Sequence, residues 1–285
     1  MPAPGVVERI RAMAELAGEQ RVLTLPATRQ LAAEFGIPRR EVELAALGER
    51  VLPARYLRSF GTLGWEGQRK LLESRAVVVG AGGLGGYVVE GLARMGVGRI
   101  HVVDGDGFQE HNLNRQLLCS EDDLGRSKAE AARDRARRVN GAVEVIAHAC
   151  FLDESNADQL LADADVAVDA LDSIPSRLLL QEAAARRGIP MVHGAIAGFY
   201  AQVMTIFPGD RGLFRFYRKE GAPVRGVEVQ LGNPAATPML CAAIQVHEAV
   251  KCLLGVGTPL RDRLLAIDAR DGYAEVQDLG GFSGP

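Results

Sequence analysis

The residues best suited to chemistry begin with a run of glycines. The chain reads Gly80-Ala81-Gly82-Gly83-Leu84-Gly85, which fits the pattern GxGxxG, between a run of β-favouring residues and a stretch with helical spacing. Such glycines let the backbone approach a phosphate group, and the N-terminus of the following helix supplies free N–H groups and a positive dipole end. The motif predicts a nucleotide-binding turn, with these candidate residues: Gly80, Gly82, Gly83 and Gly85.

Polar side chains crowd the segment after the next predicted strand. Asp104 ends that strand, where a carboxylate can bind ribose hydroxyls, and Asp106 follows it. Further along, Asn112-Leu113-Asn114-Arg115-Gln116 groups amide and guanidinium side chains. A nicotinamide-dependent dehydrogenase has no evident need for them, whereas a triphosphate needs such donors to hold it and to stabilise transferring charge. The segment therefore favours ATP over NAD as the ligand.

Two more charged residues are expected near the same strand ends. Lys128 follows Gly125-Arg126-Ser127 at the start of a predicted helix. Asp172 follows a buried strand at 166–168, at the carboxyl edge of the sheet, where ligands of such folds gather. Because Mg²⁺ is usually held by one or two carboxylates and phosphate oxygens, Asp172 is the candidate magnesium ligand.

The elements that must position these residues alternate between strand and helix. The pattern predicts strands at 76–79, 100–103, 143–148, 166–168 and 191–193, and helices at 87–95, 127–139, 157–161 and 174–187. Alternation with short loops implies a parallel sheet covered by helices on both faces. The expected fold class is α/β: a Rossmann-like sheet, mostly parallel with antiparallel C-terminal strands, plus a small α-helical N-terminal appendage.

The chain divides into two parts, residues 1–54 and residues 55–282. In the first part, predicted helices at 28–35 and 39–47 flank the turn Gly36-Ile37-Pro38 with the rhythm of a helix-turn-helix. Up to Arg55 this part has eight arginines against seven glutamates, whereas DNA-binding units usually carry a denser basic face. We interpret it as a docking or dimer-supporting appendage, and the second part as the ATP-binding domain.

Composition argues against several classes of protein. The 285 residues carry a formal net charge of -3, so no global basic field attracts nucleic acid or anionic lipid, and a nucleic-acid partner is not expected. No run approaches the roughly 18 apolar residues of a membrane span, and the first residues lack the layout of a secretory signal, so the cytoplasm is the expected location. The four cysteines include no CxxC pair, which disfavours a disulfide framework or a tetrathiolate zinc site.

In order and spacing these motifs resemble the ThiF/MoeB/HesA family, the bacterial relatives of the ubiquitin-activating enzymes. The resemblance covers Arg55 to about Leu279 and rests on these segments: Arg55-Tyr56-Leu57-Arg58, the glycine motif, Asp104-x-Asp106, Asn112 to Gln116, Gly125 to Lys128 and Asp169-x-x-Asp172. Each segment is modest alone, but the ordered set is highly specific.

The resemblance implies a role for each matching position. The implied nucleotide-binding residues are Gly80, Gly82, Gly83, Gly85, Asp104, Asp106, Asn112, Arg115, Gln116, Lys128 and Asp172. Among them Asp104 would hold the ribose, Asp172 would ligate Mg²⁺, and the phosphates would be contacted by Asn112, Arg115 and Lys128. Arg58 would reach across a dimer interface into the partner's ATP site, which implies a homodimer with composite sites. The implied catalytic set is Arg58, Arg115, Lys128 and Asp172.

The implied reaction is the ATP-dependent adenylylation of the C-terminal Gly-Gly carboxylate of a ubiquitin-like sulfur-carrier protein, with release of pyrophosphate. The substrate supplies the nucleophile, so the protein contributes alignment, Mg²⁺ and positive charge on the phosphates. The adenylate would later receive sulfur for molybdopterin, thiamine or a similar cofactor. The sequence names neither the carrier nor the pathway.

The chain departs from the family pattern in its cysteines. Many members hold zinc with two CxxC pairs, but the corresponding segments here are Leu213-Phe214-Arg215-Phe216-Tyr217-Arg218 and Gly280-Gly281-Phe282-Ser283-Gly284-Pro285, so zinc is not expected. The loop expected to cover the carrier's tail, about Arg215 to Pro234, has no cysteine for covalent capture. Cys241 lies in an apolar helical pattern at 239–254, which favours packing over catalysis.

Three alternatives fit the sequence less well. A tRNA-modifying dehydratase of the same superfamily would adenylate a small carboxylate on RNA, and the acidity of the chain speaks against it. The Asn112 to Gln116 cluster disfavours a nicotinamide-dependent oxidoreductase. The intact set of ATP-site residues disfavours a non-catalytic nucleotide-binding scaffold.

Overall fold

The computed structural model describes residues 4–217, 220 and 223–280. The strands of the larger part are β4 (Arg75–Val79), β5 (Arg99–Val103), β6 (Glu144–His148), β7 (Val166–Asp169), β8 (Met191–Ala197), β9 (Tyr200–Ile206), β10 (Arg263–Asp268) and β11 (Tyr273–Asp278). Its helices are α4 (Phe60–Glu73), α5 (Gly83–Met95), α6 (Lys128–Val139), α7 (Ala157–Leu160), α8 (Ile174–Arg187), α9 (Glu228–Leu231) and α10 (Ala236–Leu254). Within the described ranges, no helix has the combination of length and apolar composition that a membrane span requires.

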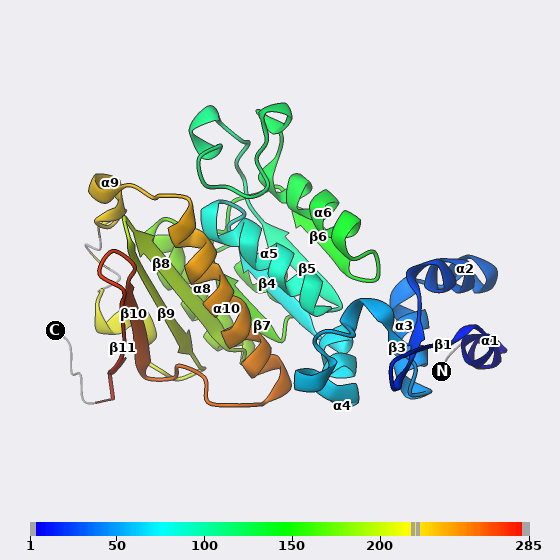
Figure 1. Cartoon of the computed structure of the whole chain (residues 1–285). Helices are drawn as coiled ribbons and strands as arrows, with labels where there is room; N and C mark the ends of the chain where they lie inside the picture. Colours follow the sequence, from blue (N-terminus) through cyan, green and yellow to red (C-terminus); the bar gives the residue numbers. More distant parts are fainter. Residues whose placement is uncertain (1–3, 218–219, 221–222, 281–285) are drawn as a thin grey trace.

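One sheet organises this part of the chain. Among the described residues its strand order is β11-β10-β9-β8-β7-β4-β5-β6 (Figure 1). The strands from β6 through β8 run parallel, whereas β9, β10 and β11 pair antiparallel. The α/β fold class predicted from the sequence, including the antiparallel C-terminal strands, is confirmed. The proposed domain limit at residue 282 lies outside the described residues.

Helices cover both faces of the sheet. The neighbours Val78 and Val79 of β4 belong to two different buried clusters, because side chains alternate along a strand. The cluster of Val78 includes side chains of α5, α6 and α10, and the cluster of Val79 includes side chains of α7 and α8. Because both faces of the parallel strands are buried, their sequences are short runs rich in β-branched residues and do not alternate with polar residues.

The register of the parallel strands brings the sequence motifs together. Val79, the last residue of β4, pairs with Val103 at the end of β5 and with Asp169 at the end of β7. The residues that follow these three strands therefore leave the sheet side by side. The glycine motif, Asp104 and the segment leading to Asp172 consequently meet at one edge.

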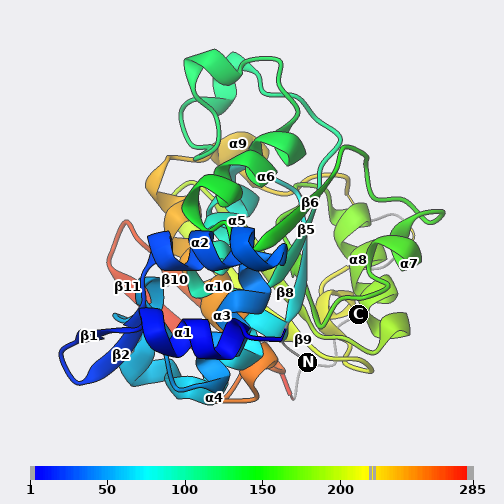
Figure 2. The same cartoon turned by 90° about the vertical axis from the view of Figure 1, so that its right-hand side faces the viewer.

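The N-terminal part is a separate small unit beside α4 (Figures 1 and 2). Its elements are α1 (Val6–Met13), β1 (Glu15–Ala17), β2 (Gln20–Leu23), α2 (Leu25–Phe35), α3 (Arg39–Gly48) and β3 (Leu52–Pro53). It has its own buried cluster, which includes Ile10, Leu31 and Val42. This cluster supports the division near residue 54, which we retain as a proposal.

The two helices predicted in this unit are present, but the expectation of an entirely helical appendage was incomplete. Ala17 pairs with Gln20, so Gly18 and Glu19 form a two-residue hairpin turn, and Gly18 has a φ of 63°. A positive φ is easily adopted by glycine. The hairpin then pairs through Val22 with Leu52 of β3, and this long-range pairing is what local helical spacing could not reveal.

Buried polar side chains join the two parts. The Asn140 side-chain amide donates a hydrogen bond of 3.0 Å to the Tyr56 hydroxyl, and it also contacts Arg55. The Arg55 guanidinium lies 3.2 Å from the carboxylate of Glu43 on α3, a side chain with no solvent exposure. The segment just before Arg58 is thereby anchored to both the N-terminal unit and the larger domain.

Candidate active site

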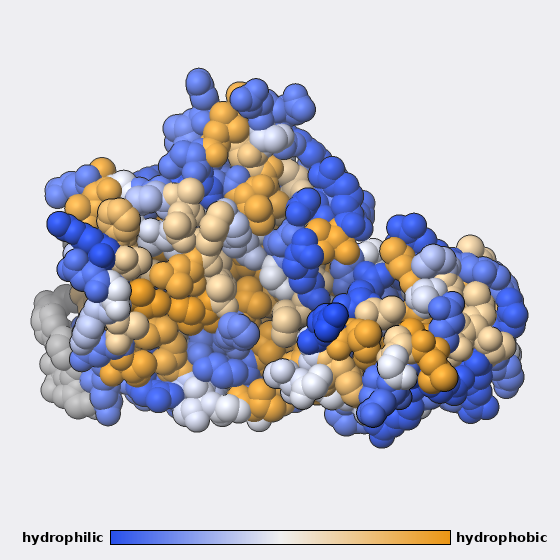
Figure 3. Space-filling model, in the orientation of Figure 1, coloured by the Kyte–Doolittle hydropathy of each residue, from blue (hydrophilic) through white to orange (hydrophobic). Residues whose placement is uncertain are grey.

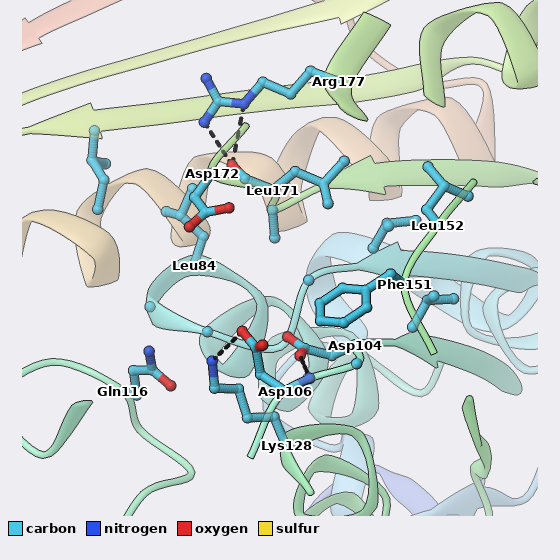
Figure 4. A pocket seen from close by; sticks show the side chains of 18 of the residues that line it. Leu84, Asp104, Asp106, Gln116, Lys128, Phe151, Leu152, Leu171, Asp172 and Arg177 are labelled. Carbon is cyan, nitrogen blue, oxygen red and sulfur yellow. Dashed lines mark hydrogen bonds and ion pairs between the residues drawn. The ribbon is translucent and has the colours of Figure 1, made fainter. Parts of the chain in front are cut away.

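A pocket lies at the carboxyl edge of the sheet, where β4, β5 and β7 end (Figure 4). The structure brings these predicted residues into its lining: Gly80, Gly82, Gly83, Asp104, Asp106, Arg115, Gln116, Lys128 and Asp172. Gly85, Asn112 and Arg58 lie outside the described lining.

The glycine turn forms one wall of the pocket. Gly80 has a φ of 95°, and a Cβ atom there would lie 2.4 Å from the carbonyl oxygen of Ala170. A Cβ atom on Gly85 would lie 1.8 Å from the carbonyl oxygen of Gly80, so a glycine at this position allows the turn to close. Because α5 begins at Gly83, its free N–H groups lie at the pocket, as phosphate binding requires.

Asp104 ties the glycine turn to the end of β5. Its carboxylate accepts hydrogen bonds from the Ala81 N–H at 2.7 Å and from the Asp106 N–H at 2.8 Å. Burial raises the pKa of Asp104, and these two hydrogen bonds oppose that shift. Each carboxylate oxygen has a further lone pair, so Asp104 can hold the turn and still accept a ribose hydroxyl.

Lys128 reaches the pocket from the start of α6. Its side chain is 9% exposed, and its Nζ atom lies 3.0 Å from an Asp106 carboxylate oxygen (Figure 4). The Ser127 hydroxyl accepts a hydrogen bond from the Glu130 N–H and caps the helix, which fixes where Lys128 emerges. An ammonium held in this way can be shared between Asp106 and a phosphate.

Arg115 and Gln116 approach from the loop after β5. The Arg115 guanidinium donates a hydrogen bond of 2.8 Å to the Asn114 side-chain oxygen, and burial lowers the pKa of Arg115. The Gln116 side chain is buried, and its amide oxygen has no partner among the described residues. An unpartnered polar atom in the wall of a pocket is a feature expected where a ligand binds.

Asn112 shapes the same loop from behind the pocket. Its side chain is buried, and its oxygen accepts a hydrogen bond of 2.9 Å from the Gln109 N–H. It caps the short turn that precedes Arg115 and Gln116. The geometry gives Asn112 a role in shaping this loop, and the phosphate contact implied by the resemblance stays a prediction.

Asp172 stands at the opposite wall and fits a magnesium ligand. Its side chain is 69% exposed and pairs with Arg225 at 2.9 Å. Within the described ranges, no three His, Cys, Asp or Glu side chains are grouped so that they could hold a metal ion. A single accessible carboxylate suits Mg²⁺, which usually keeps water and phosphate oxygens as its other ligands.

Phe151 is a pocket residue that the sequence motifs did not indicate. It follows the end of β6, is 66% exposed and lines the pocket. A Cβ atom on Gly105 would lie 2.7 Å from its ring, so the ring packs closely against a backbone without a side chain. An accessible aromatic face of this kind can stack on a base. Its position just beyond a third strand end is the signal that could have identified it.

A groove of about 460 Å³ is lined by residues of β8, β9, β10 and β11 and by Tyr217, Val227 and Glu228. Its floor includes the cross-strand row Ala195, Gln202, Ala266 and Glu275, whose neighbours pair in register. The groove and the nucleotide pocket share Arg177, Ile196 and Glu228, so the two cavities meet. A chain lying in the groove could bring its end to the nucleotide pocket.

Arg58 lies in a different groove. Its side chain is exposed and lines a cavity of about 530 Å³ together with Tyr87 of α5 and Met239 and Val246 of α10. Figure 3 shows apolar side chains across the front of this helical layer. Arg58 is thus separated from the nucleotide pocket of its own chain.

Cys241 is a packing residue. It is fully buried, its thiol contacts the Ala195 and Gln202 carbonyls, and burial raises its pKa to about 12. The thiolate is the nucleophilic form of cysteine, so this environment suppresses reactivity. The predicted burial of Cys241 is confirmed.

Known proteins share both the sequence and the fold. Residues 54–279 match the ThiF family model. The SAMP-activating enzyme E1 of Haloferax volcanii is 42% identical over 73% of this chain and 78% of its own length. The sulfur carrier protein adenylyltransferase of Thermus thermophilus is 38% identical over 73% of this chain and 79% of its own length. The crystal structure of E. coli MccB matches with a TM-score of 0.67 and 21% identity, over 90% of this chain and 83% of that one.

The chain belongs to the ThiF family, whose members are ATP-dependent adenylyltransferases. The ATP-binding function predicted from the glycine motif and the polar cluster is thereby confirmed, and the alternative of a nicotinamide-dependent oxidoreductase is set aside.

Proposed function

We propose that this adenylyltransferase activates the C-terminal carboxylate of a ubiquitin-like sulfur-carrier protein ending in Gly-Gly. Relatives that are 36–42% identical are named for the activation of SAMP or the adenylylation of a sulfur carrier. The single observation that carries the proposal is the junction at Arg177 and Ile196, where the groove opens into the nucleotide pocket.

The groove suits a thin, extended tail. Its floor contains Ala195 and Ala266, whose small side chains leave room for a polypeptide backbone. Crossing from β11 to β8 covers about 14 Å, since neighbouring strands lie about 4.8 Å apart. An extended tail of about four residues covers that distance. Terminal glycines would then pass Ile196 and enter the nucleotide pocket.

In the proposed reaction, a carboxylate oxygen of the carrier attacks the α-phosphorus of ATP. The new bond joins that oxygen to the α-phosphorus, and the bond from the α-phosphorus to the β-phosphate oxygen breaks, so pyrophosphate leaves. Lys128 and Arg115 place positive charge at the phosphates, and the N–H groups at Gly83 hold them in line. The substrate supplies the nucleophile, so the catalytic contribution of the protein is alignment and electrostatic stabilisation.

Mg²⁺, which we propose is held by Asp172, would supply additional positive charge to the phosphate oxygens. We also propose that the enzyme works without structural zinc, because its sequence lacks CxxC pairs. Part of the two segments where such pairs would stand, residues 218 and 281–285, lies outside the described residues. Elemental analysis of the dialysed protein checks this expectation, which about one zinc per chain would contradict.

We further propose a homodimer in which Arg58 completes the ATP site of the partner subunit. Support comes from its exposed position in the groove between α5 and α10, away from its own nucleotide pocket. A guanidinium stays charged at every relevant pH and can brace a phosphate. The requirement for ATP favours the cytoplasm as the location of the reaction.

Carrier-dependent pyrophosphate exchange tests the proposed function. The purified protein is incubated with Mg²⁺, ATP and labelled pyrophosphate, and a panel of Gly-Gly carriers is added one at a time. We expect label to enter ATP with at least one carrier and not with the same carrier lacking its last two glycines. Exchange that is independent of the tail, or absent with every carrier, would contradict the proposal.

A further inference from the structure

Arg177 occupies the junction between the two cavities. It lies in the first turn of α8, and its side chain is 14% exposed. Among the described residues that line the groove, Arg177 has the one basic side chain, whereas Glu228, Asp268 and Glu275 are acidic. The acidic side chains make most of the groove unfavourable for a carboxylate, and at the junction, where Glu228 also lies, Arg177 supplies the opposing positive charge.

The position of the Arg177 guanidinium is fixed by the turn that carries Asp172. Its Nε and Nη2 atoms donate hydrogen bonds of 3.1 and 2.6 Å to the Leu171 carbonyl (Figure 4). The Asp169 carboxylate lies 3.7 Å from Nε and accepts a hydrogen bond of 3.0 Å from the Leu171 N–H. The Nδ1 atom of the buried His193 lies 2.6 Å from Asp169 Oδ2, the oxygen that faces Arg177 Nε.

This arrangement leaves one side of the guanidinium available. Nε and Nη2 are engaged by Leu171, and no hydrogen bond joins Nη1 to another described residue. In the view of Figure 4, Asp172 lies between Arg177 and Lys128, and Arg177 lines both the groove and the nucleotide pocket. A carboxylate entering a half-buried site needs a donor of opposite charge, because an unpaired buried charge is strongly unfavourable.

We propose that Arg177 is the residue that receives the C-terminal carboxylate of the carrier and orients it toward the α-phosphorus. The inference rests on the proposed function and adds a specific receptor for the reacting group. Arg177 is then a substrate-binding residue for the tail. Asp169 and His193 act through it as positioning residues.

The test compares binding of a carrier in two forms, one with its natural terminal carboxylate and one with a terminal amide. The probe is the carrier that supports pyrophosphate exchange, prepared in both forms and titrated by fluorescence anisotropy. We expect the wild-type protein to prefer the carboxylate by about 10- to 100-fold, the range for a hydrogen-bonded charged group. Arg177→Gln should abolish that preference, while the affinity for ATP, measured by calorimetry, changes by less than about two-fold.

Two further variants keep the test decisive. Arg186→Gln, on the same helix but paired with Asp158 at its far end, should behave as wild type. Arg177→Lys keeps a positive charge without the planar fork, so an intermediate preference is expected, and this variant serves if Arg177→Gln does not fold.

Three outcomes would overturn the inference: an unchanged preference in Arg177→Gln, an equal loss for carboxylate and amide, or a large loss of ATP affinity. An equal loss would mean that Arg177 only shapes the groove, and a loss of ATP affinity would assign it to the nucleotide. Each of these leaves carrier-dependent exchange by the wild-type protein intact. Failure of the proposed function would instead appear as no exchange in the wild type.

Discussion

At the residue scale, the proposed phosphate and metal ligands are already held by partners of opposite charge. Lys128 pairs with Asp106, and Asp172 pairs with Arg225. Such pairs keep the side chains oriented toward the pocket, and ATP and Mg²⁺ must compete with them. We therefore propose that Lys128 and Asp172 are already oriented toward the phosphates and Mg²⁺ when the reaction begins. Preorganised sites stabilise transferring charge in this way.

Replacing Arg115, Lys128 or Asp172 singly by alanine should reduce carrier-dependent pyrophosphate exchange by on the order of 10²-fold or more. Each substitution removes a charged side chain that we propose contacts the phosphates or Mg²⁺. Thermal unfolding should show that the fold survives. Arg69→Ala, which removes an exposed helical ion pair, is the matched control and should leave exchange unchanged. Near-normal exchange in any one of the three variants would remove that residue from the site.

Most of the pocket residues could be predicted because their positions depend on where strands end. Gly80, Asp104 and Asp172 follow predicted strands, and parallel strands place their carboxyl ends together. Asn112 differs because its side chain bonds locally to Gln109, and residue type alone does not reveal the direction in which an amide points. Arg177 was not identified because its importance depends on the junction of two cavities, which no local pattern encodes.

At the element scale, described residues between β9 and α10 line both the groove and the nucleotide pocket. Tyr217, Val227 and Glu228 line the groove, and Arg225 of the same segment reaches Asp172. The hydrogen bond from the Ile174 N–H to the Val224 carbonyl attaches the segment to the start of α8. If Asp172 holds Mg²⁺ as proposed, its contact with Arg225 competes with the metal ion.

Arg225→Gln should therefore strengthen Mg²⁺-dependent ATP binding. The pair is exposed, so the gain should be only about two- to five-fold, in line with the small energies of surface ion pairs. Calorimetric titration of ATP with and without Mg²⁺ measures it, and Arg270→Gln in an exposed turn is the control. Weaker ATP binding in Arg225→Gln would show that Arg225 contacts the nucleotide itself.

The strands and helices of the larger domain could be predicted because each has a strong local sequence pattern. The helix at 174–187 agrees with α8 at both ends, since Ser173 caps its start and Gly188 adopts a left-handed φ of 72° at its end. The groove could not be predicted in the same way. It depends on cross-strand pairs such as Gln202 with Ala266, which are far apart in the sequence.

At the scale of the whole molecule, the N-terminal unit contacts the larger domain through a buried carboxylate. Burial is the largest influence on Glu43 and raises its pKa to about 7, while the nearby charge of Arg55 opposes the shift. Neither carboxylate oxygen has a well-aligned hydrogen bond from the described residues. The attachment of the unit should therefore depend on pH.

The folded state keeps the Glu43 proton up to about pH 7, whereas the unfolded chain releases it near the ordinary glutamate pKa of 4.5. Stability should consequently fall as pH rises through this window, by about 3 kcal/mol in total. Glu43→Gln should remove most of that fall, as measured by denaturant unfolding at several pH values. Glu19→Gln, in the exposed hairpin turn, is the control. An unchanged pH dependence in Glu43→Gln would show that Glu43 is ionised in the folded protein.

The composite site of the proposed homodimer makes a prediction about mixed subunits. Arg58→Ala and Asp172→Ala should each be inactive alone, and mixing them should restore up to about a quarter of wild-type activity if subunits exchange at random. In a mixed dimer, Arg58 of the Asp172→Ala subunit completes the site of the Arg58→Ala subunit, whose Asp172 is intact. One of the two sites is therefore complete. If exchange of subunits is demonstrated and activity stays absent, Arg58 acts within its own chain or has no role in catalysis.

The central claim is attack of a carrier carboxylate on the α-phosphorus of ATP. The most direct measurement follows the label from ATP into the carrier, using ATP labelled at the α-phosphate in one reaction and at the γ-phosphate in another. The account predicts that the carrier gains the α-label and the mass of one adenylate, that the γ-label leaves as pyrophosphate, and that both changes require the terminal carboxylate. Transfer of the γ-label to the carrier, or α-label incorporation into a carrier whose C-terminus is an amide, would contradict it.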